Sequence, residues 1–231
     1  MQQLLLDLSQ PPPPTLTNFA VGGNAEPLHA LHTWLRGAVH ERCIYLWGAS
    51  GCGKTHILRA LVQAAHELGR TAAYSRPEQV EALDALAEVP TLIALDDVER
   101  LSEQEQAALF RLFQRATETD TLLLVSADTA PAALTLREDL RTRLASGLTF
   151  QMHLLSDDEK AQALARHAAQ RGFELVPEVA QYLLRRRQRD LPSLMQVLDA
   201  LDQHSLRTRR PITLALLREV LQPEDIAARP S

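Results

Sequence analysis

The chain has 231 residues, of which 45% are hydrophobic, so it can bury the core of one or two domains. Its 24 basic and 29 acidic side chains give a net charge of −5. No apolar run approaches the roughly 18 residues of a membrane span, and the start lacks the features of a secretion signal. Two cysteines make no disulfide framework, and no Cys/His cluster has zinc spacing. We therefore expect a soluble, cytoplasmic protein without membrane contacts.

The first 18 residues form a segment of their own. A short apolar stretch is followed by four consecutive prolines, residues 11–14. Prolines in a row favour extended polyproline II and cannot continue a helix. This composition predicts a stiff spacer that holds a short peptide away from the body of the protein.

Strand-like and helical patterns then alternate as far as about residue 155. We expect strands at 43–47, 71–74, 91–95, 121–126 and 149–154, separated by helices at 26–39, 54–68, 78–88, 102–117 and 137–145. Ser102 and Glu105 have the spacing of a capping box at a helix start. Alternation of this kind predicts an α/β domain over residues 19–155, with a parallel sheet covered by helices on both faces.

Beyond residue 155 only helical patterns remain. They cover 157–171, 177–188, 191–207 and 213–222, and Ser156 with Glu159 forms a second capping-box pattern. Residues 156–225 are therefore expected to form a small all-helical domain.

A glycine-rich loop joins the first expected strand to the helix after it. It has the pattern GxxxxGK[ST], which in this strand-to-helix context is typical of a phosphate-binding loop. Its N–H groups point inward, and the helix N-terminus adds partial positive charge. Lys54 should reach the β- and γ-phosphates, and Thr55 should ligate Mg²⁺. The residues expected to bind nucleotide here are Gly48, Ser50, Gly51, Cys52, Gly53, Lys54 and Thr55.

Two aspartates follow the strand expected at 91–95, at the edge of a parallel sheet where ligands bind. Asp96 should organise Mg²⁺, and Asp97 could orient the attacking water. Ser126 and Asp128 follow the apolar run 122–125 of the next strand, so a polar group there could contact the γ-phosphate or the water. We assign Asp128 to this role, with capping of a turn as the alternative.

These motifs, together with the helical domain, resemble the AAA+ ATPases of the initiator clade typified by DnaA. The resemblance covers about residues 15–222. The segment Asn18-Phe19-Ala-Val21-Gly22 is similar to the adenine-pocket segment of the clade. The resemblance to the clade implies an AAA+ fold with a helical lid and ADP or ATP as the bound nucleotide. It also implies that Val21 and Gly22 contact the base.

The segment Leu140-Arg-Thr-Arg143-Leu-Ala-Ser-Gly147 resembles the clade's box VII, in which an arginine projects towards nucleotide held by a neighbouring subunit. The resemblance places Arg143 at this arginine-finger position, with Arg141 as the second choice. A fixed guanidinium can neutralise charge that develops on the transferred phosphoryl group. The alternative is a solvated helix whose arginines form surface pairs.

One position departs from the clade. Its lid carries an arginine that faces the bound nucleotide, and Pro192 stands at the corresponding position of this chain. Arg189, one turn earlier, is the candidate to replace that arginine. We therefore expect a regulator that holds nucleotide and has at most weak ATPase activity of its own.

The first residues resemble QLxLxL, a peptide that docks on the bacterial sliding clamp. Gln3 would form a hydrogen bond at the edge of a hydrophobic groove that takes Leu4, Leu6 and Leu8. The alternative is a terminal strand that packs on the core. Only Gln222–Ser231 follow the last expected helix, so we expect no counterpart of the duplex-binding domain of DnaA in these 231 residues.

Taken together, these features resemble the DnaA-homologous regulatory inactivators. The resemblance implies a negative regulator of replication initiation with two protein partners, the DnaA initiator and the sliding clamp, and with DNA contacted mainly through the clamp. Bound to the DNA-loaded clamp, it would stimulate hydrolysis of DnaA-bound ATP and leave inactive ADP–DnaA. Whether the chain forms a homo-oligomer stays open.

Two alternatives remain. The first is a helicase or transposition-target loader of the same clade, which should carry an additional segment for that partner. The second is a DNA-binding module that uses a basic lid surface. A solvated helix face explains the same arginines without DNA, since no aromatic side chains are interleaved with them. The arginines concerned are Arg185, Arg186, Arg187, Arg189, Arg207, Arg209 and Arg210.

Overall fold

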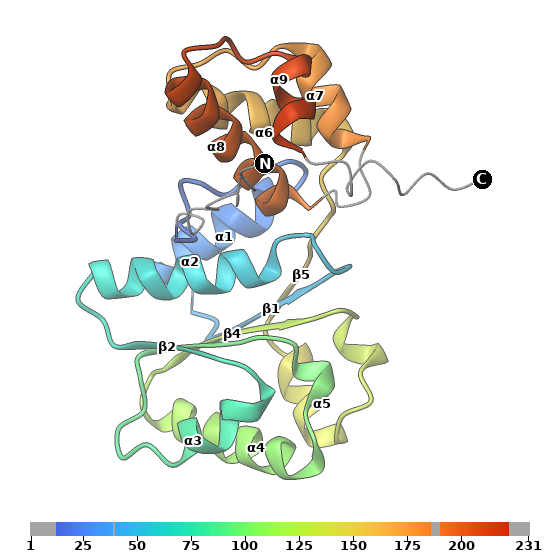
Figure 1. Cartoon of the computed structure of the whole chain (residues 1–231). Coiled ribbons are helices and arrows are strands. Elements are labelled where there is room, and N and C mark those ends of the chain that lie inside the picture. The colour runs from blue at the N-terminus through green and yellow to red at the C-terminus, as the bar shows by residue number, and fades with distance from the viewer. Residues whose placement is uncertain (1–12, 39, 186–189, 222–231) are drawn as a thin grey trace. The chain divides into compact units, whose positions relative to one another are not determined.

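The computed structural model describes residues 13–38, 40–185 and 190–221. These residues belong to two compact units, Pro13–Leu154 and the described residues from Leu155 onward (Figure 1). Among the helices of the described ranges, none is both long and apolar enough to cross a membrane.

The first unit is built on a five-stranded, wholly parallel sheet with the order β2-β3-β4-β1-β5. This arrangement confirms the predicted α/β fold. Because all strands run the same way, their carboxyl ends meet at one edge, where β1, β3 and β4 deliver the motif residues. The strands are β1 Cys43–Trp47, β2 Ala72–Ser75, β3 Leu92–Leu95, β4 Leu122–Ala127 and β5 Leu148–Gln151.

Helices cover both faces of the sheet because successive strand residues point to opposite sides (Figure 1). In β1, Ile44 and Leu46 pack with residues of α1 and α2, whereas Tyr45 packs with residues of α3, α4 and α5. Each side therefore has its own buried core. The helices of this unit are α1 Ala25–Leu35, α2 Lys54–Glu67, α3 Val80–Asp84, α4 Glu103–Glu118 and α5 Glu138–Ala145.

The second unit is helical over its described residues, as predicted. Its helices are α6 Asp157–Gln170, α7 Pro177–Leu184, α8 Leu191–Thr208 and α9 Leu214–Val220, and leucines from all of them form one core. A polar network around two buried aspartates also joins the end of α6 to α8. The carboxylate of Asp199 lies 2.6 Å from Nε2 of His167 and 3.3 Å from Arg171, which also bonds Asp202 at 3.0 Å.

Both predicted capping boxes are present. Ser102 accepts a hydrogen bond from the Glu105 N–H at 3.4 Å, and Glu105 accepts one from the Ser102 N–H at 2.7 Å. Ser156 and Glu159 repeat the arrangement at the start of α6. These reciprocal bonds satisfy N–H groups that the first helical turn leaves without partners.

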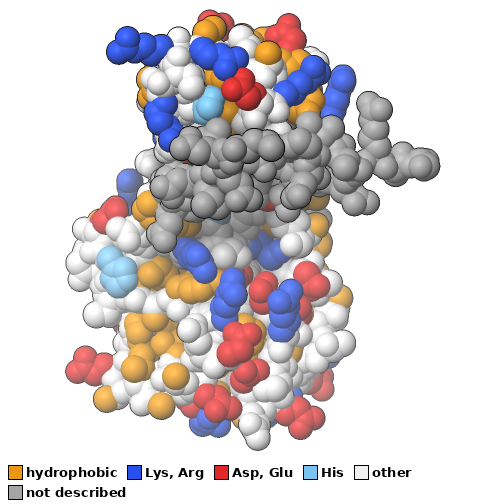
Figure 2. All heavy atoms as spheres, viewed as in Figure 1, with side chains coloured by type: hydrophobic (Ala, Val, Ile, Leu, Met, Phe, Trp, Pro, Cys, Tyr) orange, Lys and Arg blue, Asp and Glu red, His pale blue; other side chains and the backbone are white. Residues whose placement is uncertain are grey.

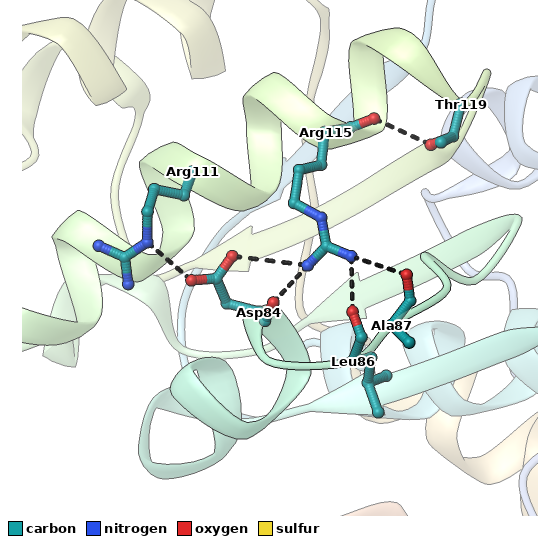
Figure 3. Close-up of polar contacts among 6 residues, drawn as sticks. All are labelled: Asp84, Leu86, Ala87, Arg111, Arg115 and Thr119. Atoms are coloured by element: carbon teal, nitrogen blue, oxygen red, sulfur yellow. Dashed lines mark hydrogen bonds and ion pairs between the residues drawn. The ribbon is translucent and has the colours of Figure 1, made fainter.

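The helix expected at 78–88 is wrong in its length. A 3₁₀ turn, Pro77–Gln79, leads into the short helix α3, which ends at Asp84. Figure 3 shows the reason: the Arg115 guanidinium on α4 donates to the backbone carbonyls of Asp84 and Leu86, the latter at 2.6 Å. A helix that reached residue 88 would need the Asp84 carbonyl for a bond with the N–H of Glu88.

Arg111 and Arg115 also share the carboxylate of Asp84, at 2.8 and 3.8 Å (Figure 3). Arg115 is the more buried of the two arginines, with 30% of its side chain exposed against 56% for Arg111. The segment that leads from α3 to β3 is therefore attached to α4 mainly by Arg115.

We expect the change Arg115→Ala to lower the free energy of unfolding by about 1–2 kcal/mol, because it leaves backbone carbonyls without a donor. The matched change Arg111→Ala removes one exposed ion pair and should cost less than about 1 kcal/mol. Urea unfolding of both variants measures the difference. Equal losses would contradict this account of why α3 ends at Asp84.

Candidate nucleotide-binding site

The loop between β1 and α2 can form only with glycine at two of its positions. A Cβ atom on Gly48 would overlap the carbonyl oxygen of Met152. Gly53 has φ +101°, and a Cβ there would lie 2.7 Å from Cε2 of Phe19. The backbone just after β5 and the ring of Phe19 therefore approach the loop closely, which restricts its path.

Lys54, the first residue of α2, points back into this loop. Its Nζ donates to the carbonyl oxygen of Gly48 at 2.6 Å and to that of Ala49 at 3.4 Å, and the residue is only 8% exposed. The loop carbonyls thus compensate a buried positive charge. Phosphate oxygens carry more negative charge than carbonyls and are the stronger acceptors for this ammonium group.

The carboxylate of Asp96 is bonded by side chains from α2, β2 and β4. It lies directly after β3, is 1% exposed and accepts hydrogen bonds from three side-chain hydroxyls. Thr55 of α2 donates to Oδ2 at 2.7 Å, Tyr74 of β2 donates to the same oxygen at 2.8 Å, and Ser126 of β4 donates to Oδ1. The structure thereby brings together Thr55 and Asp96, the residues expected to bind Mg²⁺.

These oxygen donors fit a magnesium ion, which takes few protein ligands and completes its shell with water and phosphate oxygens. A hydroxyl and a carboxylate 2.7 Å apart, beside a phosphate loop, are such a donor set. Within the described ranges, no cluster of three or more His, Cys, Asp or Glu residues offers an all-protein metal site.

Tyr74 and Ser126 are the partners of Asp96 that the motifs did not assign. Burial raises the pKa of Tyr74, and the neighbouring Asp96 carboxylate raises it further, although Arg76 acts in the opposite direction. The phenol therefore keeps its proton and remains a donor. Only the pairing of β3 with β2 and β4 brings these two hydroxyls to Asp96.

Asp97 adopts a left-handed backbone conformation, with φ +53°, and its N–H donates to the Ser126 hydroxyl at 3.4 Å. Asp128, just after β4, is exposed, whereas Ser126, within β4, contacts Asp96. A third acid, Glu99, lies in the same region. Burial raises its pKa, and the charges of Asp128 and Asp97 add to the effect. The sequence motifs did not indicate Glu99.

The segment expected to contact adenine, around Val21 and Gly22, is fixed by hydrogen bonds of Asn24. The Asn24 N–H donates to the Val21 carbonyl at 2.8 Å and closes a turn that contains Gly22, with φ +48°. The buried Asn24 side chain then forms two hydrogen bonds with the backbone of His153, at 3.0 and 2.7 Å. Asn24 was not predicted, because its partner is 129 residues away.

Phe19 attaches the same segment to the start of α2. Its ring lies against Gly53 and 5.4 Å from the ring of His56. Nε2 of His56 lies 3.0 Å from the Thr15 carbonyl, and burial lowers the pKa of this histidine. The N-terminal segment is therefore held over the phosphate loop by contacts on both sides.

Arg143 lies on α5, where it is half-buried, and its guanidinium covers the ring of Phe110 at 4.8 Å. Its guanidinium forms no ion pair with any carboxylate of the described ranges. Arg141 is also half-buried. The structure thus stacks Arg143 against α4 and does not bring it to Lys54 or Asp96.

Other predicted residues belong to the second unit or to segments without a described structure. Pro192 is the second residue of α8, whose start is capped by Asp190 through a 2.9 Å bond to the Ser193 N–H. A proline at this place needs no helical donor. Arg189 and the peptide residues Gln3, Leu4, Leu6 and Leu8 lie outside the described residues.

The basic surface of the second unit is mixed in charge. Figure 2 shows acidic side chains among the basic ones on the face it presents. Arg210 pairs with Glu219 at 2.8 Å, and the Arg218 guanidinium lies over the ring of Tyr182 at 5.5 Å. Two of the unit's arginines are therefore already engaged within it.

The chain matches two protein-family models. Residues 15–151, more than half of the chain, match the model of the bacterial DnaA ATPase domain. The chain belongs to the bacterial DnaA ATPase-domain family. Residues 157–221 match a second model, that of the Hda lid domain. The predicted resemblance to the DnaA clade is confirmed, and the second match adds a lid of the Hda type to the DnaA-family domain.

Solved structures share the DnaA-like fold. Domain III of Thermotoga maritima DnaA superposes with a TM-score of 0.76 at 20% identity, covering 96% of this chain and 100% of that one. AMPPCP-bound DnaA from Aquifex aeolicus gives 0.69 at 22%, covering 86% and 70%. The Thermotoga maritima RuvB branch-migration motor gives 0.64 at 17%, covering 90% and 71%. At identities of 17–22%, the similarity shows a shared fold and no more than that.

The site leads to a direct prediction about Lys54. The change Lys54→Ala should weaken ADP binding on the order of 100-fold, since hydrogen bonds to charged groups contribute about 1.5–3 kcal/mol each. Titration with a fluorescent ADP analogue measures this. Lys160, the other lysine of the chain, lies on α6 and provides the control Lys160→Ala. Similar affinities of the two variants would show that Lys54 does not bind phosphate.

Proposed function

We propose that this protein is a negative regulator of chromosomal replication initiation in the cytoplasm. Together with the DNA-loaded sliding clamp, it stimulates hydrolysis of DnaA-bound ATP and leaves inactive ADP–DnaA. The observation that carries the proposal is the match of a DnaA ATPase domain followed directly by an Hda lid domain. The sequence resemblance to DnaA-homologous regulatory inactivators points the same way.

The nucleotide of the regulator itself, ADP or ATP, is held by the loop. Lys54 binds the β- and γ-phosphate positions, and the turn at Val21 and Gly22 contacts the base. Thr55 and Asp96 bind Mg²⁺, which neutralises phosphate charge when it is bound. The buried, hydrogen-bonded Lys54 and Asp96 support this role, because both charged groups are oriented before nucleotide arrives.

The regulator hydrolyses its own ATP weakly or not at all. Asp97 and Asp128 are the proposed groups that orient water at this site. Pro192 supports a low rate, since a proline carries no charge that could reach a phosphate. Its position in the first turn of α8 fits a helix start instead.

Arg143 is the proposed group that acts on the partner. Its guanidinium enters the nucleotide site of DnaA and neutralises charge on the γ-phosphoryl group during transfer, an effect of about 10³–10⁵ in rate for arginine fingers. Its half-exposed position, without an ion pair among the described residues, supports this role, because no carboxylate there has to be displaced.

In a reconstitution with ATP–DnaA and clamp-loaded DNA, Arg143→Ala should abolish stimulated hydrolysis and leave binding to the clamp unchanged. Arg141→Ala, on the same helix, should keep most of the activity. Release of phosphate from DnaA-bound ATP is the measurement. Full activity of Arg143→Ala would refute the finger assignment, and no stimulation by the wild-type chain would refute the function.

The N-terminal peptide supplies the clamp dependence. Docking through Gln3, Leu4, Leu6 and Leu8 raises the local concentration of the regulator where DNA is being copied. The four prolines at 11–14 support this role, because consecutive prolines favour an extended chain. DNA is contacted mainly through the clamp.

The double change Gln3→Ala and Leu4→Ala should remove the stimulation that the clamp provides. Loss of one hydrogen bond and one buried leucine weakens such a peptide on the order of 100-fold. Binding to immobilised clamp measures it, and ADP binding serves as the control, which should not change. Unaltered clamp affinity would show that the first residues do not dock.

A further inference from the structure

Tyr74, a residue of β2, bonds the side chain of Asp96. The strands β2 and β3 pair in parallel, with Tyr74 opposite Ala94 and Ser75 opposite Leu95. The N–H of Asp96 continues this ladder by donating to the Ser75 carbonyl at 3.0 Å. The backbone of the two strands therefore fixes the Tyr74 ring beside the Asp96 carboxylate.

The hydroxyl of Tyr74 bonds a carboxylate that is itself buried. It donates to Oδ2 of Asp96 at 2.8 Å, and this oxygen also accepts from the Thr55 hydroxyl at 2.7 Å. Asp96 is 1% exposed, so solvent cannot take over a donor that is removed. Oδ2 is thus held between one proposed magnesium ligand, Thr55, and one group that binds no metal.

Two arginines contact the side chain of Tyr74. Nε of Arg76 donates to the Tyr74 hydroxyl oxygen at 3.3 Å, and the Arg59 guanidinium lies over the ring at 4.8 Å. A donor on the phenol oxygen polarises its O–H bond and strengthens the bond that this hydroxyl donates. The chain Arg76–Tyr74–Asp96 runs from the surface to the buried carboxylate.

We propose that Tyr74 is a positioning residue for the magnesium site: its hydroxyl fixes the Asp96 carboxylate in the orientation that faces Thr55. This inference rests on the proposed binding of Mg²⁺ with nucleotide. Groups that orient a metal-binding carboxylate are typically worth about 10–100-fold in metal affinity. Tyr74 therefore sets how much Mg²⁺ the nucleotide complex needs.

The test separates Mg²⁺ from nucleotide. Binding of a fluorescent ADP analogue is measured in EDTA and at increasing Mg²⁺ concentration, for the wild type and for Tyr74→Phe. We expect the Mg²⁺ concentration at half-maximal effect to rise about tenfold in the variant. The affinity in EDTA should stay the same, because Tyr74 contacts the carboxylate and not the phosphate loop.

Tyr45→Phe is the matched control. Tyr45 is likewise a strand tyrosine of the same sheet, but its hydroxyl donates to the Thr129 carbonyl at 2.8 Å. Its loss should leave the Mg²⁺ midpoint unchanged. A shift of equal size in Tyr45→Phe would overturn the proposal, since any lost tyrosine hydroxyl would then have the same effect.

The inference is wrong if Tyr74→Phe keeps the wild-type midpoint, or if it loses ADP affinity equally with and without Mg²⁺. Should that variant fail to fold, Arg76→Gln at the exposed end of the chain should shift the midpoint about threefold in the same direction. An unchanged midpoint there overturns the proposal as well. If binding of the ADP analogue to the wild type does not depend on Mg²⁺, the magnesium site of the proposed function itself is refuted.

Discussion

A buried carboxylate organises the functional edge of this protein. Burying a charged group is costly unless it is fully hydrogen-bonded. Asp96 meets this condition through hydroxyls of Thr55, Tyr74 and Ser126, which come from α2, β2 and β4. Elements on both sides of β3 must therefore keep their register. The same bonds that compensate the charge also orient it towards the phosphate loop, so stability and site geometry depend on one group.

Lys54 is the positive counterpart of Asp96 at the same edge. Its ammonium is compensated by loop carbonyls, whose place phosphate oxygens would take in the proposed complex. The loop itself has little freedom, because Met152 and Phe19 lie against its glycines. Nucleotide thus meets charges that are already in place. Such preorganisation costs no reordering when the ligand binds.

Local patterns predicted the elements and the motif residues, whereas long-range pairing determined the rest. The spacing of Lys54 and Thr55 is a property of one loop, and the strand before Asp96 is a plain apolar run. Tyr74 reaches Asp96 only because β2 pairs with β3, and Asn24 bonds a residue 129 positions away. The end of α3 is set by Arg115, which lies on another helix. No periodicity within a single element indicates these partners.

The fold alone does not decide what the protein does, because a branch-migration motor shares it at 17% identity. What distinguishes this chain is the combination of a DnaA-family ATPase domain with an Hda lid domain. A nucleotide site with fixed charges and a separate arginine on α5 then suit different tasks. In the first, hydrogen bonds hold the lysine and the carboxylate in place before any ligand arrives. The second is stacked on Phe110 of α4, on a helix that contributes no residue to the phosphate loop, which suits its proposed action on a nucleotide that another protein holds.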